Sequence, residues 1–124
     1  MTVPLRALAT REAELVRRLC EAIVPGSSRV APEVYVDAVA AELPRAELER
    51  LLAAIDALAA SIDDLASVAS TPAFQQLRAL ACEAFYSDFV APGAAGPGAW
   101  AEIGFSFPLA DRVAKDWSFM GIEP

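Results

Sequence analysis

Apolar residues recur at intervals of three and four over a long stretch in the middle of the chain. Beyond Arg45 this series consists of Leu48, Leu51, Leu52, Ile55, Leu58, Ala59, Ile62 and Leu65. The spacing places one apolar face along a helix, because an α-helix completes a turn every 3.6 residues. A serine and two aspartates within 61–64 favour turns over helix interiors, so we expect the helix to break there. The strongest pattern in the chain therefore predicts helical structure.

Three other segments have helical periodicity and end at residues that stop helices. Thr10 can cap the first of them, which Pro25-Gly26 ends, and Pro32 suits the first position of a short second helix that ends before Pro44. Thr71-Pro72 is a cap followed by proline at the first helical position of another helix. We therefore predict an all-α bundle of about four to five helices, with the first, third and fourth forming the core.

The chain of 124 residues has the length of a single domain. We divide it into an N-terminal extension (1–9), the helices, a Pro/Gly-rich and aromatic loop (91–108), and an aromatic C-terminal tail (117–124). The run 100–108 is expected to be irregular, because Phe105 and Phe107 alternate as in a strand but no partner strand exists elsewhere. A short helix is expected to begin at Pro108 or Leu109 and to run to Asp116.

The sequence contains no histidine, which excludes Ser-His-Asp triads, Cys-His dyads and HExxH zinc sites. Ten basic and 17 acidic residues leave a net charge of −7 at pH 7, which disfavours binding to nucleic acid. Cys20 and Cys82 have no metal-ligand spacing, so we interpret them as buried small residues, with a disulfide as the alternative. We expect no cofactor and no metal in this chain.

Several carboxylates and hydroxyls could be considered for acid–base chemistry, but none has a spacing that organises a metal or a catalytic pair. We assign them to helix caps and to hydrogen bonds of buried hydroxyls. They are Asp63, Asp64, Asp111 and Asp116, with the clusters Tyr86, Ser87, Asp88 and Tyr35, Asp37. A small enzyme that uses carboxylates or Tyr86 is the weakest functional alternative.

Neither an export signal nor a membrane span is visible in the sequence. The longest uncharged stretches, 65–77 and 89–101, contain proline and fall short of the roughly 20 apolar residues that a spanning helix needs. The first residues carry no apolar run behind a basic region, as a signal peptide would. We therefore expect a cytoplasmic protein.

The aromatic residues gather in the second half of the chain, and the first 73 residues contain only Tyr35. Aromatic residues and methionine are enriched in the cores of protein interfaces, and large apolar residues near a chain end need a covering surface. We predict a partner-binding surface formed by Trp100, Phe105, Phe107, Trp117, Phe119 and Met120. The alternative is that these side chains form a core over alanine-rich helices.

Three segments of the chain have a recognisable pattern: REAELVRRLCEAIVPGS, APEVYVDAVAAEL and the later helix end ACEAFYSD. They resemble the gluconate 2-dehydrogenase subunit 3 family. In this family the first helix closes on two hydrophobic residues and a proline, matched here by Ile23-Val24-Pro25. The second helix carries a Tyr-x-Asp-like element, matched by Tyr35 and Asp37. The match covers roughly the first 45 residues, and the rest agrees only in helical and aromatic character.

The resemblance implies a non-catalytic small subunit that binds and stabilises a larger flavin-dependent oxidoreductase of the glucose-methanol-choline (GMC) type. FAD and the redox chemistry would belong to that larger subunit, acting on a sugar, glycoside or other alcohol, and the two chains would form a hetero-oligomer. A self-associating helical interaction protein without a redox partner is the alternative function.

Overall fold

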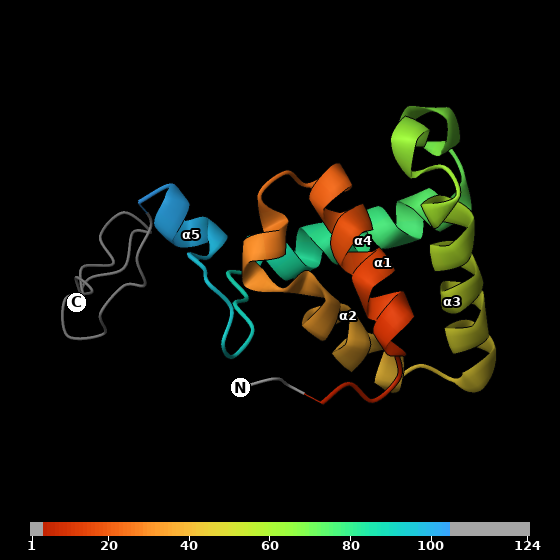
Figure 1. Cartoon of the computed structure of the whole chain (residues 1–124), viewed down its shortest axis with the longest axis horizontal. Coiled ribbons are helices and arrows are strands. Elements are labelled where there is room, and N and C mark those ends of the chain that lie inside the picture. The colour runs from red at the N-terminus through yellow and green to blue at the C-terminus, as the bar shows by residue number, and fades with distance from the viewer. Residues whose placement is uncertain (1–3, 105–124) are drawn as a thin grey trace, which may run out of the picture.

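Every regular element within residues 4–104, which the computed structural model describes, is helical. This confirms the predicted all-α fold of a small single domain. The elements are α1 (Thr10–Ile23), the 3-10 helix η1 (Ser27–Val30), α2 (Pro32–Ala41), α3 (Arg45–Ala59), the 3-10 helix η2 (Ile62–Val68), α4 (Pro72–Tyr86) and the single turn α5 (Ala99–Glu102). Helix α4 extends from α3 at one end of the domain toward α5 at the other (Figure 1).

Helices α1 to α4 surround one hydrophobic core. Its fully buried side chains include Val16 and Leu19 of α1, Val36 of α2, Leu51 and Ile55 of α3, and Leu77 of α4. The first, third and fourth helices form the core as predicted, and α2, which was not expected there, belongs to it as well because it packs against both α1 and α4. A short helix can bury Val36 and Ala40 completely because its neighbours lie on both sides.

Two helices start at the residues that the sequence predicts, and one helix starts differently. Pro32 is the first residue of α2, and the hydroxyl of Thr71 accepts a hydrogen bond of 3.3 Å from the N–H of Phe74 at the start of α4. Thr10 does not cap α1 but is its first residue. The carboxylate of Glu12 accepts a hydrogen bond from the Ala9 N–H at 2.8 Å, so Ala9 rather than Thr10 is the N-cap of α1.

The predicted break after the long central helix is confirmed. Helix α3 ends at Ala59, and the chain continues as η2, with a kink at Asp64 where φ is −147° and ψ is 63°. Asp63 and Asp64 both lie exposed within η2. The central stripe of apolar residues is therefore divided between two elements rather than presented by one.

The region after α4 differs from the expected course of the chain. Helix α4 ends at Tyr86, before Phe89, because Asp88 adopts the left-handed conformation with φ of 66°. Residues 99–102, where irregular structure was predicted from Trp100 onward, form the helical turn α5. The alternation of Phe105 and Phe107 and the short helix expected from Pro108 or Leu109 lie outside the described residues.

A buried carboxylate ties the N-terminal segment to α2. Asp37 accepts hydrogen bonds from the backbone N–H groups of Arg6, Ala7 and Leu8 at 2.8 to 3.1 Å. Burial alone would raise the pKa of Asp37, but these three N–H groups and the charge of Arg6 outweigh it and hold the pKa below its usual value. Leu8 is thereby placed in the core.

Both cysteines are free thiols, Cys20 buried and Cys82 half-buried. Within residues 4–104, no helix has the length and apolar character to cross a membrane.

Candidate interaction surface

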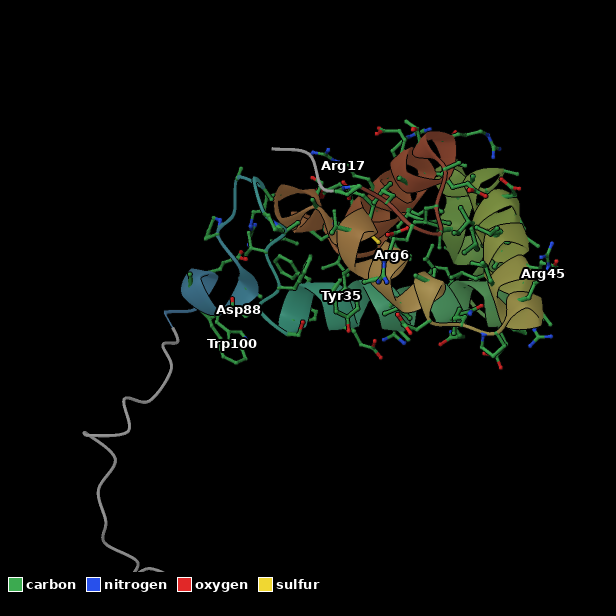
Figure 2. All side chains as sticks on the ribbon, turned by 90° about the horizontal axis from the view of Figure 1, so that it is seen from below. Arg6, Arg17, Tyr35, Arg45, Asp88 and Trp100 are labelled. Carbon is green, nitrogen blue, oxygen red and sulfur yellow. The ribbon has the colours of Figure 1, made fainter. Side chains whose placement is uncertain are left out.

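Large apolar side chains are exposed at one end of the domain. Among the described residues these are Tyr86, Val90 and Ile103, whose exposed fractions are 59%, 39% and 78%. Trp100, which is half-buried, lies with them at the end of α4 and on α5. We call the set Tyr86, Val90, Trp100 and Ile103 the α5 surface. Figure 2 shows Trp100 and Asp88 at the end of the domain opposite Arg45.

Two hydrogen bonds fix Trp100 on this surface. Its backbone N–H donates to Oδ1 of Asp88 at 3.1 Å, and its indole Nε1–H donates to the carbonyl oxygen of Tyr86 at 3.0 Å. The polar edge of the indole is therefore satisfied while the ring covers the edge of the core. Because these bonds hold the Trp100 side chain in one orientation, it would lose less conformational entropy when a partner binds.

Gly98 allows the close approach between α5 and the end of α4. A Cβ atom at this position would lie 2.3 Å from Oδ1 of Asp88 and 3.2 Å from Cγ2 of Val90. Only glycine therefore fits between the Asp88 carboxylate and the first turn of α5. The same carboxylate receives the Trp100 N–H, so Asp88 caps α5 from a different part of the chain.

Arg29 of η1 connects the segment that carries α5 to the helical core. Its Nε–H donates to the carbonyl oxygen of Pro97 at 2.8 Å, and its Nη2 is paired with the carboxylate of Glu102. The guanidinium lies over the ring of Phe85, and the Arg29 carbonyl accepts the N–H of Gly96 at 2.9 Å. Arg29 thus contacts the loop, α5 and α4 at once.

The predicted partner-binding residues are only partly described. Trp100 lies on the α5 surface, whereas Phe105, Phe107, Trp117, Phe119 and Met120 lie outside the described residues. Val90 and Ile103 were not predicted from the sequence to belong to this surface, and Tyr86 was considered only for its hydroxyl. The spacing of Ile103, three residues after Trp100, would have indicated a shared helical face if α5 had been recognised.

The polar clusters considered for chemistry have structural contacts. Asp37 holds the N-terminal segment, and Asp88 caps α5. The hydroxyl of Tyr35 contacts Oε2 of Glu83 at 3.4 Å, and its ring packs edge-on against Phe89 with centroids 5.4 Å apart. The described part of the chain contains no group of three or more His, Cys, Asp or Glu residues that could hold a metal ion.

Comparison of the chain with protein-family models, curated proteins and solved structures found no significant match. The resemblance to the gluconate 2-dehydrogenase subunit 3 family therefore stays a prediction.

Proposed function

We propose that this chain is a non-catalytic small subunit that binds and stabilises a larger FAD-dependent oxidoreductase of the GMC type, acting on a sugar, glycoside or other alcohol. The observation that carries the binding part of this proposal is the α5 surface. It combines a fixed tryptophan with three exposed large apolar side chains at one end of the domain. Interfaces concentrate their binding energy in aromatic side chains of this kind.

The identity of the partner rests on the sequence resemblance. Ile23-Val24-Pro25 and the Tyr35 and Asp37 element support it, and the flavin would be held entirely by the large subunit. Asp37 contributes to the small subunit by ordering its N-terminal segment rather than by contacting substrate. The small subunit would therefore supply contact area and stability, while the partner supplies catalysis.

Co-expression with a GMC-type flavoprotein encoded beside this chain tests the proposal. We expect the tagged small chain to capture the flavoprotein, and the captured complex to show the absorbance of bound FAD. The variants Ile103→Ser and Tyr86→Ser should each weaken the complex by about tenfold or more, because exposed interface anchors are lost without damage to the core. Ala57→Ser, an exposed position on α3, is the matched control and should leave binding unchanged.

Self-association through the same surface is the competing outcome. In that case the purified chain would form oligomers that Ile103→Ser converts to monomers, as measured by light scattering, and no flavoprotein would be captured. Capture of the flavoprotein to the same extent by Ile103→Ser and the parent chain would contradict the assignment of the α5 surface.

A further inference from the structure

A groove separate from the α5 surface lies between the N-terminal segment, α1 and the loop after α4. Its volume is about 710 Å³, within the range of small-molecule sites, and none of its lining residues belongs to the α5 surface. Small apolar side chains form most of its wall, among them Leu5, Leu8, Ala13, Val34 and Pro92. A wall of this kind suits the apolar body of an organic molecule.

Two carboxylates and two guanidinium groups line the groove. Glu14 and Arg17 of α1 and Glu33 of α2 all line it. Arg29 also lines it, but the guanidinium of Arg29 is bound to Glu102 and to the Pro97 carbonyl. Arg17 is therefore the cation of the lining without such fixed hydrogen bonds, and the carboxylates of Glu14 and Glu33 lie on the same groove.

The Glu33 carboxylate has the N–H of its own backbone as a donor, but one of its oxygens is unpartnered. Its side chain is 13% exposed, and its Oε1 lies 4.0 Å from Nη1 of Arg17, beyond hydrogen-bond distance. Its Oε2 is buried and has no hydrogen-bond partner among the described residues. The last torsion of a glutamate side chain is broad and two-fold, so the carboxylate can turn either oxygen toward the groove. A buried acceptor without a donor indicates a place where a ligand can supply one.

We propose that this groove binds a small organic ammonium ion, with the Glu33 carboxylate as its counter-ion and the apolar wall around its hydrocarbon part. An ammonium group has three N–H donors, so it can donate a hydrogen bond to the Glu33 carboxylate, which Arg17 does not reach. An organic anion placed beside the Glu33 carboxylate would be repelled by it. A neutral alcohol of the same shape would keep the apolar contacts but lose the charge-assisted hydrogen bond.

The ionisation of Glu33 adds a dependence on pH. Burial raises the pKa of Glu33 and the charge of Glu14 adds to this rise, although the N–H of its own backbone and the charge of Arg17 act in the opposite direction. The other titratable group near it, the Cys20 thiol, is neutral because its own pKa is raised to about 12. Protonated Glu33 cannot act as a counter-ion, so the affinity for the ammonium ion should fall as the pH drops through the raised pKa of Glu33.

Calorimetric titration of the full chain with hexylammonium, 1-hexanol and hexanoate tests the site. At about 0.15 M salt, where long-range attraction is screened, hexylammonium should bind about tenfold or more tightly than 1-hexanol, and hexanoate should not bind. Glu33→Gln should reduce the affinity for hexylammonium to that for 1-hexanol. Glu49→Gln removes the same charge from an exposed position on α3 and should change nothing.

Glu14→Gln, at an exposed position on the rim of the groove, is a second variant for the case that Glu33→Gln does not fold. We expect it to weaken hexylammonium binding by about twofold to threefold. Equal affinities for hexylammonium and 1-hexanol would overturn the proposal. So would equal losses in the Glu14→Gln and Glu49→Gln variants, because attraction would then come from the net charge alone. Absence of any hexylammonium binding to the parent chain would overturn it as well.

Discussion

The guanidinium of Arg29 lies 4.9 Å from the centre of the Phe85 ring. The same guanidinium donates a hydrogen bond to the Pro97 carbonyl and pairs with Glu102. A cation over an aromatic face is stabilised by the negative potential of the ring. Phe85 is buried in the core, so this contact joins the segment that carries α5 to a fixed part of the domain. Arg29 of η1 therefore holds α5 in place together with Asp88.

Replacing Arg29 with alanine should release α5 without unfolding the core. We expect a loss of about 1 to 2 kcal/mol in the free energy of unfolding, from the cation–π contact and the hydrogen bond. Hydrogen exchange of the amides in 99–104 should accelerate, while that of α1 stays slow. Arg45→Ala is the control, because the Arg45 side chain forms an exposed pair with Glu49, and its loss should cost less than about 0.5 kcal/mol. Unchanged exchange at 99–104 would contradict this role of Arg29.

Asp37→Asn should destabilise the domain by about 2 kcal/mol at about pH 7, because a charged acceptor of several backbone N–H groups is replaced by a neutral one. The pKa of Asp37 is lowered in the folded chain, so its contribution is present above the unfolded pKa of about 3.9 and lost as the pH falls through the folded value. Urea unfolding at several pH values measures this difference.

The gap in unfolding free energy between parent and Asp37→Asn should therefore narrow below about pH 4. Asp63→Asn, at an exposed position in η2, should show no comparable loss at any of these pH values. A gap that stays constant from neutral to acidic pH would show that the Asp37 charge does not stabilise the N-terminal segment.

Gly98→Ala should disturb the seating of α5 through a clash of its Cβ with Oδ1 of Asp88. We expect a destabilisation of about 1 to 3 kcal/mol, typical of inserting an atom into a filled space, and a change in the near-ultraviolet signal of the tryptophans. Asp88→Gly in the same background should recover part of the stability, since it removes the clashing carboxylate and suits the positive φ of residue 88. A double variant no more stable than Gly98→Ala would show that the clash lies elsewhere.

The two cysteines should differ in reactivity. Burial raises the pKa of the Cys20 thiol to about 12, with smaller contributions from Glu33 and Cys82, and the thiolate is the reactive form. Iodoacetamide should therefore modify Cys82, which is half-buried, and leave Cys20 unmodified in the folded chain. Peptide mass mapping before and after denaturation in urea measures this, and rapid labelling of Cys20 in the folded chain would contradict it.

Local signals were sufficient to predict the main helices. Pro32 and Thr71 start their helices as expected because the first turn of a helix depends on residues within that turn. The break after Ala59 was also predicted, because serine and aspartate disfavour helix interiors wherever they occur. These features need no information from distant parts of the chain.

Other features depend on contacts between residues far apart in sequence. Helix α5 is held by Asp88 and by Arg29, and the pairing of Arg29 with Glu102 spans 73 residues. The N-terminal segment is ordered by Asp37, about 30 positions further along the chain. No periodicity encodes such pairs, so a four-residue helix was expected to be irregular.

The candidate surface was predicted in part for the same reason. Trp100 stood out by composition alone, because large aromatic residues are enriched in interfaces. The exposure of Tyr86 and Val90 depends on where α4 ends, and this is determined by the left-handed backbone at Asp88. The groove beside Glu33 was not predicted at all, because it brings together residues from three separate segments.

The order of the elements has a consequence for synthesis of the protein. All four helices of the core are complete by Tyr86, and the residues that Arg29 holds, Pro97 and Glu102, follow them. A chain made from its N-terminus can thus begin to pack its four helices before Ala99 and Trp100, which complete one edge of the core, leave the ribosome. The exposed side chain of Ile103 then emerges after these helices rather than among them, which limits aggregation of the nascent chain.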